Sequence, residues 1–186
     1  MKKEYAKLRR KPFLTPIWLA AMAAIVVVSF TVWLWGTATS TTVVLVRHAE
    51  KQLNAGDDPN LTPIGEARAA LLARMFGDRA PLGRLDAIYV SPTRRSHQTA
   101  APLATRLGIQ VTEGPEDDIK QLARMVLREH QGGRVLIVGH SNTVPGLVER
   151  FAGEGKVPDI GDDEYGTMYI VTVPRIGHAN VLRLSY

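Results

Sequence analysis

The chain has 186 residues and no cysteine, a length that allows one domain with a proper core. Its net charge of +5 suggests nucleic-acid binding, but six of the 23 basic residues and one of the 18 acidic residues lie within the first 35 positions. The remaining 151 residues therefore carry 17 charges of each sign. A formally neutral domain lacks the electrostatic footprint of a nucleic-acid-binding protein, so we expect no nucleic-acid partner.

An uncharged stretch runs from Pro12 to Val46, and its centre, residues 16–35 (PIWLAAMAAIVVVSFTVWLW), is almost wholly apolar. A helix of that length extends over about 30 Å, the thickness of the hydrocarbon core of a bilayer. All three tryptophans lie near its ends, as in an interfacial aromatic belt. We therefore predict a transmembrane signal-anchor helix at 16–35, after a basic cytoplasmic tail at 1–15 and before a linker at 36–42.

The charges that flank this span predict its orientation. Six lysines and arginines precede it, and none follows it for many residues, so the positive-inside rule leaves the N-terminus in the cytoplasm. A cleaved signal peptide is the alternative, because GTA before Thr39 resembles a cleavage site. Signal peptides have apolar regions of about 7–15 residues, and this one is longer. We therefore expect a retained single-pass anchor in the inner or plasma membrane, with the domain at 43–186 in the periplasm or outside the cell.

Strands and helices alternate along the domain. Residues 43–46 are short, continuous and β-branched, which is typical of a buried strand. A helix follows, with Thr62 as its N-cap, Pro63 at its first position and Gly77 at its end. The helix is also indicated by apolar residues that recur at three- and four-residue spacing: Ile64, Ala67, Leu71, Leu72 and Met75.

The rest of the domain continues the alternation. We expect strands at 85–91, 109–112, 134–140, 167–173 and 180–186, and helices at 94–107, 115–131 and 142–153. Pro102 should kink the helix at 94–107 or delay its start. Strands that alternate with helices predict a three-layer α/β/α fold with a mainly parallel central sheet.

Polar residues follow three of these strands. The first strand ends at Arg47 and His48, the second runs into Ser91 and the pair Arg94 and Arg95, and the strand at 134–140 ends at His140. In open α/β sheets, ligands bind beyond the carboxyl ends of the strands. Guanidinium groups match phosphate oxygens in a bidentate way, and a neutral imidazole can attack phosphorus. We therefore predict a phosphoryl-transfer site, in which the nearby arginines should keep His48 neutral.

Three motifs carry a family resemblance: LVRHAEK (45–51), SPTRRSHQTA (91–100) and VGHSNT (138–143). They resemble the histidine phosphatase superfamily, in its phosphoglycerate mutase-like branch with the RHG motif. Ala49 stands where glycine is commoner, and Ser96 stands where alanine is usual. The resemblance covers roughly residues 43–186 and implies the phosphoglycerate mutase-like fold.

The resemblance also implies residue roles. His48 would be the nucleophile that becomes phosphorylated, while Arg47, Arg95 and His140 would bind the phosphoryl oxygens and stabilise the transition state. Asn54 falls where many members have an asparagine in the phosphate pocket. No cofactor and no metal are expected, because the acidic groups at 57–58, 117–118 and 162–164 lack the spacing with histidines of a metal site. His97, His130 and His178 are expected at the surface.

The proton donor to the leaving group is not fixed by the resemblance. Members with an HD motif use the aspartate after the second histidine, but Ser141 occupies that position here. Glu113, just after the third strand, is the preferred candidate. Glu50, Glu116 and Asp117 are the alternatives.

The expected function is a membrane-anchored phosphatase that hydrolyses a phosphomonoester or phosphohistidine through a covalent phosphohistidine on His48. Its substrate would be a phosphorylated small molecule or a phosphorylated protein or lipid. A phosphate-binding pseudo-enzyme or a partner-binding module without turnover is the alternative. A phosphomutase fits less well, because mutases of this family usually have longer insertions.

Overall fold

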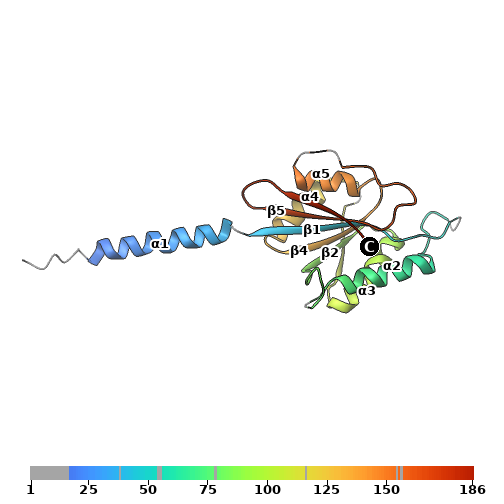
Figure 1. The fold of residues 1–186 in the computed structure, drawn as a ribbon, viewed down its shortest axis with the longest axis horizontal. Coiled ribbons are helices and arrows are strands. Elements are labelled where there is room, and N and C mark those ends of the chain that lie inside the picture. Colours follow the sequence, from blue (N-terminus) through green and yellow to red (C-terminus); the bar gives the residue numbers. More distant parts are fainter. Residues whose placement is uncertain are drawn as a thin grey trace, which may run out of the picture. The chain divides into compact units, whose positions relative to one another are not determined.

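The computed structural model describes residues 17–37, 39–53, 56–77, 79–115, 117–153, 155 and 157–186. The chain divides into two compact units after Thr37. Helix α1 (Ile17–Thr37) belongs to the first unit, and an α/β domain forms the second (Figure 1). The two units are described separately below.

Helix α1 is apolar around its whole circumference. Its window Ile17–Leu34 has a mean hydropathy of 2.3, and none of that window is buried. By length and composition α1 can cross a membrane, although a signal sequence near the N-terminus has the same properties. The helix covers 17–37, where the sequence predicted 16–35.

The central sheet has the strand order β3-β2-β4-β1-β5-β6. Strands β1 to β4 pair in parallel, and β5 and β6 are antiparallel additions at one edge, so the prediction of a mainly parallel sheet is confirmed. Their bounds are β1 (Ser40–Arg47), β2 (Ala87–Val90), β3 (Val111–Glu113), β4 (Arg134–Gly139), β5 (Thr167–Pro174) and β6 (Asn180–Ser185). Because β1 begins at Ser40, residues 40–42 of the predicted linker are strand.

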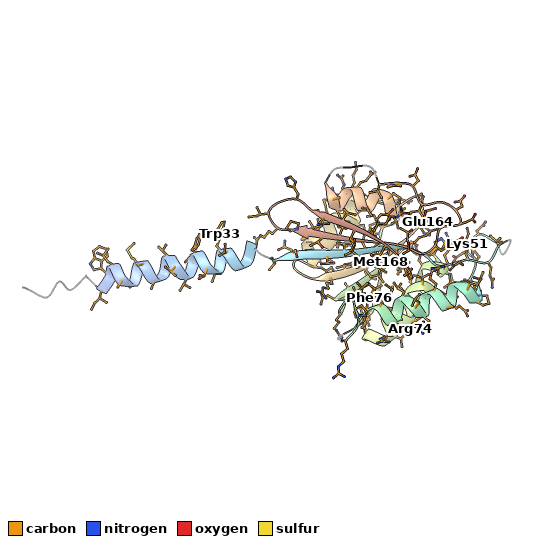
Figure 2. All side chains as sticks on the ribbon, viewed as in Figure 1. Trp33, Lys51, Arg74, Phe76, Glu164 and Met168 are labelled. Carbon is orange, nitrogen blue, oxygen red and sulfur yellow. The ribbon has the colours of Figure 1, made fainter. Side chains whose placement is uncertain are left out.

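Helices cover both faces of the sheet (Figure 1). Helices α2 (Pro63–Met75) and α3 (Arg94–Leu107) pack on one face, and α4 (Ile119–Glu129) and α5 (Val144–Ala152) pack on the other. Figure 2 labels two buried residues of the core between the sheet and helices α2 and α3, Phe76 and Met168. The predicted three-layer α/β/α fold is therefore confirmed.

Several predicted boundaries shift. The third strand is Val111–Glu113 instead of 109–112. The helix expected at 115–131 is shorter, because the Asp118 carboxylate accepts the Gln121 N–H at 2.8 Å and thereby caps α4. Pro102 does not delay α3, which starts at Arg94 and continues past the proline.

The apolar spacing that predicted α2 does not mark the face that the helix buries. The N-cap is right, since the Thr62 hydroxyl accepts the Gly65 N–H at 3.1 Å. However, Ile64 is 67% exposed, and the buried residues are Gly65, Ala69, Leu72 and Ala73. Gly65 lies against the backbone of Glu50, where a Cβ atom would collide with the carbonyl oxygen. Small side chains at Gly65, Ala69 and Ala73 let α2 approach its neighbours closely, whereas Ile64 points outward.

Two adjacent leucines of α2 test this packing. Leu72 is fully buried and Leu71 is 36% exposed. Leu72→Ala should lower the free energy of unfolding by about 2–5 kcal/mol, because it leaves a cavity in the core. Leu71→Ala should cost about 1 kcal/mol or less. Urea unfolding followed by circular dichroism measures both, and equal losses would contradict the orientation of α2.

Candidate active site

The pairing of β1 with β4 brings the two predicted histidines together. Arg47 lies opposite Gly139 in the parallel ladder, so His48 and His140 leave the sheet as neighbours. The His48 N–H donates to the Gly139 carbonyl at 2.9 Å. The two imidazole rings meet edge to face with their centroids 5.2 Å apart. Their residues are only 3% and 8% exposed.

A single hydrogen bond defines the tautomer of His48. Its Nδ1 lies 2.8 Å from the Ala49 carbonyl oxygen. A carbonyl can only accept, so in this bond Nδ1 carries the proton and Nε2 of the neutral ring keeps its lone pair. The Ala49 N–H in turn donates to the Thr99 hydroxyl at 2.9 Å. The backbone that orients His48 is thereby tied to α3.

Arg47 is held by a segment distant in sequence. Its Nη1 donates to the backbone carbonyls of Gly161, Asp162 and Glu164 at 2.7, 2.8 and 3.2 Å. Its guanidinium carbon lies 4.2 Å from the centroid of the Tyr165 ring, which is 6.1 Å from the ring of His48. The segment 161–165 therefore fixes Arg47 and forms one wall beside His48.

Arg95 projects from the first turn of α3. Its Nη1 is 3.6 Å from Oδ1 of Asp58, and the same carboxylate accepts the backbone N–H of Arg94 at 2.9 Å. The Nε atoms of Arg47 and Arg95 are buried and have no hydrogen-bond acceptor among the described residues. Buried donors without a partner are uncommon and costly, and they suit a site for an anionic ligand.

Buried hydroxyls fix the turn between β2 and α3. The Ser91 and Ser96 hydroxyl oxygens are 2.7 Å apart, and the Thr99 hydroxyl donates to the Arg95 carbonyl at 2.8 Å. Ser96, which replaces the usual alanine of the resemblance, thus has a place in this hydroxyl cluster. These contacts hold the start of α3, from which Arg95 extends.

The environment keeps both histidines neutral. Burial lowers the pKa of His48 to about 3, against an opposing contribution from the Ala49 carbonyl. Burial also lowers the pKa of His140 to about 4, and the positive charges of Arg95 and Arg47 add to both shifts. The lowered pKa agrees with the prediction that His48 is neutral. However, the main cause of the shift is desolvation and not the charge of the arginines.

The candidate proton donors have different surroundings. Glu113 is exposed at the end of β3, with Oε1 2.9 Å from Nε2 of His97. Glu50 forms an ion pair with Arg68 at 2.6 Å; although burial opposes it, the hydrogen bonds from Arg68 hold the pKa of Glu50 below its usual range. Asp117 is exposed. Glu116 and the predicted phosphate-pocket residue Asn54 lie outside the described residues.

The remaining predicted residues are also placed. His178 is exposed, whereas His130 is half-buried with Nε2 2.9 Å from the Tyr89 hydroxyl, so it is not a free surface residue. Within the described parts of the chain, no group of three or more histidines and carboxylates could hold a metal ion. Lys51 and Glu164 lie at the same end of the domain (Figure 2).

Sequence reasoning missed Tyr165 and Asp58 as neighbours of the site. Tyr165 follows an acidic run in an irregular segment, where no periodicity marks a residue that packs on a distant arginine. In the sequence Asp58 stands out only as part of an acidic pair without metal-site spacing, but its carboxylate contacts both α3 and Arg95. The local signal for Tyr165 is an aromatic side chain two residues before β5.

Comparison with known proteins agrees with this geometry. Residues 43–116 match the model of the histidine phosphatase superfamily (branch 1). The structure of the protein histidine phosphatase SixA complexed with tungstate superposes with a TM-score of 0.65 at 22% identity, over 77% of this chain and 96% of that chain. Residues 43–116 are therefore similar to this superfamily, and the likeness to the SixA structure shows a shared fold.

Two further relatives are informative. The mycobacterial glucosyl-3-phosphoglycerate phosphatase has a TM-score of 0.61 at 15% identity, over 79% of this chain and 98% of that chain. "Putative phosphoserine phosphatase 2" of Hydrogenobacter thermophilus is 35% identical over 94 residues, which is 47% of this chain. The chain spans only 42% of that relative's length. The structural neighbours confirm the phosphoglycerate mutase-like fold.

The region that matches the family model contains Arg47, His48 and Arg95 but ends before His140. The tertiary structure brings His140 close to these residues, because β4 lies beside β1. All four predicted side chains therefore meet at one edge of the sheet.

The buried histidines predict an acid-sensitive fold. A histidine in an unfolded chain titrates near 6.5, whereas His48 and His140 stay neutral down to about pH 3 and about pH 4. At pH values below 6.5 and above these folded-state pKa values, the two histidines bind protons in the unfolded chain but not in the folded domain. The free energy of unfolding should therefore fall as the pH drops below 6.5, by at most about 1.4 kcal/mol per pH unit for each histidine.

Urea unfolding at pH 7 and at pH 5 measures this loss. The double change His48→Gln with His140→Gln should flatten the pH dependence, and the exposed His178→Gln change is the matched control. An unchanged slope in the double variant would show that the two imidazoles are not neutral in the folded state.

Proposed function

We propose that the protein is a phosphatase in which Nε2 of His48 attacks the phosphorus of a phosphorylated substrate. The bond from phosphorus to the leaving group breaks, and the leaving group takes the electron pair. Water then attacks the phosphohistidine, inorganic phosphate leaves, and His48 returns to the neutral form. The observation that carries this proposal is the buried imidazole, whose Nδ1 donates to Ala49 and whose Nε2 keeps its lone pair.

Three cationic or polar neighbours would stabilise the transferring phosphoryl group. Arg47 and Arg95 supply fixed positive charge, and their buried Nε–H groups have no acceptor among the described residues. His140, with its ring edge to face with that of His48, would contact another phosphoryl oxygen. Such preorganised donors favour the transition state because the protein has already desolvated and oriented them.

A phosphomonoester substrate needs a proton donor for its leaving group. Glu50 is held ionised by Arg68 and cannot easily donate a proton. Glu113 is the acid that we propose for a phosphomonoester, although its carboxylate is exposed and pairs with His97. A phosphohistidine substrate needs less help, because its imidazole leaves readily. The structurally similar SixA is a protein histidine phosphatase, which supports the same substrate class for this chain.

A phosphate-binding protein without turnover is the second candidate. The exposure of Glu113 and the ion pair of Glu50 favour it, since neither residue is an evident proton donor. The buried, correctly tautomeric His48 favours the enzyme instead, because phosphate binding alone does not need a nucleophile.

We further propose that α1 anchors the chain in the inner or plasma membrane, with the N-terminus in the cytoplasm and the domain at 43–186 outside it. The basic residues before α1 and the hydropathy of Ile17–Leu34 support this topology.

Substitution of His48 tests the chemistry. His48→Ala should abolish phosphate release from p-nitrophenyl phosphate or a phosphohistidine peptide and remove the covalent phosphoenzyme. Arg95→Ala removes electrostatic stabilisation but leaves the nucleophile, so turnover should fall by about 10²–10³. Rapid quench with labelled substrate should show an acid-labile, base-stable phosphoramidate, and His178→Ala is the control.

Near-normal turnover of His48→Ala would refute the nucleophile. If the unaltered protein binds phosphate but neither releases it from substrates nor forms a phosphoenzyme, the non-enzymatic candidate holds instead.

Membrane fractionation tests the anchor. The full chain should stay in the membrane fraction after a high-salt wash, because burial of the apolar α1 does not depend on charge. A reporter fused after Tyr186 that works only outside the cytoplasm should be active. A soluble chain beginning near Thr39 would show cleavage, and an active cytoplasm-only reporter would reverse the orientation.

A further inference from the structure

The charges of the domain are neutral in sum but segregated in space. Helices α2 to α5 each have an arginine in the last turn, at the end of the sheet opposite His48: Arg74, Arg106, Arg128 and Arg150. The loops and strand ends at this end add four more: Arg79, Arg84, Arg134 and Arg175. All eight are exposed. We call this surface the basic end.

Few acidic side chains at the basic end compensate the positive charge of its arginines. Among the described residues there are Asp86, Glu129 and Glu149. Two of them are engaged by backbone, since Asp86 accepts the Arg134 N–H at 2.7 Å and Glu149 accepts the Val157 N–H at 3.1 Å. The exposed acids gather instead around the active-site edge: Asp57, Asp58, Glu66, Glu113, Asp117, Asp118, Asp162 and Asp163.

Helix dipoles explain only part of this pattern. A cation in the last turn stabilises a helix, which accounts for one arginine on each of the four helices. Arg84 also contacts a helix terminus, because its Nη2 donates to the Leu107 carbonyl at the end of α3 at 3.0 Å. Arg79, Arg134 and Arg175 lie outside the helices, and the dipole of a helix they belong to cannot explain them. Their accumulation at one end therefore needs another reason.

The chain enters the domain at this same end. Helix α1 ends at Thr37 and β1 begins at Ser40, so the apolar helix is tied to the amino end of β1. The Thr39 carbonyl accepts the Arg175 N–H at 3.3 Å. Thr39, which we call the tether, therefore lies beside the turn between β5 and β6. That turn is thus the part of the basic end next to the attachment point.

The turn between β5 and β6 also exposes an apolar side chain. Ile176 is 65% exposed and lies between Arg175 and His178, and Gly177 adopts a φ of +111° that suits a tight turn. An exposed apolar residue flanked by basic ones is the composition of a contact with the headgroup region of a membrane.

We propose that the basic end docks on the anionic lipid headgroups of the membrane that α1 enters, with Ile176 in the interfacial layer. The proposal rests on the membrane anchor proposed above and not on the phosphatase chemistry. Arginines attract anionic lipids over short range, and the tether keeps them close to the surface.

Docking in this orientation determines where the substrate comes from. The eight residues of β1 lead from the tether to the active site, and at about 3.3 Å per residue they span about 26 Å. His48 would then face the aqueous phase at the far edge of the domain. A water-soluble phosphorylated molecule or protein could reach it, whereas a phosphorylated lipid in the same bilayer could not.

Fluorescence of the full chain in nanodiscs tests the docking. The chain has no cysteine, so Ile176→Cys gives a single site for an environment-sensitive dye. Ile64→Cys is the matched control, because it is 67% exposed and lies in the first turn of α2 at the active-site end. Nanodiscs of phosphatidylcholine are compared with equimolar phosphatidylcholine and phosphatidylglycerol.

The dye at 176 should shift to shorter wavelength and be quenched by lipid-attached quenchers only in the anionic discs. About 1 M salt should reverse the shift, since it reduces the Debye length to about 3 Å. Arg128→Glu should weaken the shift, whereas Lys120→Glu, at the opposite end of the same helix α4, should not.

Equal emission at 176 in both disc types, or the same shift at 64, would overturn the proposal. So would a shift that persists at high salt, because the contact would then not depend on the arginines. Release of phosphate from p-nitrophenyl phosphate by the same discs tests the chemistry separately, so failure of docking and failure of the proposed function can be distinguished.

Discussion

The parallel pairing of β1 with β4 is the constraint on which the rest of the site depends. The ladder places Arg47 opposite Gly139, so each strand delivers a histidine to the same point beyond its carboxyl end. A slip of one residue would turn the side chains of β1 to the other face and separate the two imidazoles. Both strands are buried in the centre of the sheet, where the helices on either side fix this register.

Desolvation keeps the two histidines neutral, which is the form in which an imidazole can act as a nucleophile. His48 and His140 are largely removed from water, which would otherwise stabilise a charged imidazole. The cost of burying that charge lowers both pKa values far below neutrality. The same burial requires that cationic Arg47 be compensated, and three backbone carbonyls together with Tyr165 do so. The site thus combines neutral imidazoles with fixed guanidinium charges, an arrangement suited to bind a phosphoryl group before attacking it.

The two ends of the sheet have opposite surroundings. Acidic side chains surround the buried cations at the carboxyl ends of the parallel strands, while exposed arginines gather where the strands begin. In alternating α/β folds the helices run opposite to the strands, so all helix C-termini meet at the second end. An arginine in each last turn therefore adds to the same surface, and the chain from α1 enters there.

The sequence by itself determined the alternation of elements, the ends of the central strands, the Thr62 cap and the length of the apolar span. Each is a local property of a few neighbouring residues, as are the motifs that carry Arg47, His48, Arg95 and His140. Only the tertiary structure decided which face of α2 is buried, because the fit of Gly65 against Glu50 depends on two separate segments. Likewise, the hydrogen bonds of Arg47 to the carbonyls of Gly161, Asp162 and Glu164 join positions 114 to 117 residues apart, which no local pattern can predict. The burial that sets the pKa of His48 and the gathering of arginines at one end also arise from packing, since they depend on which distant residues become neighbours.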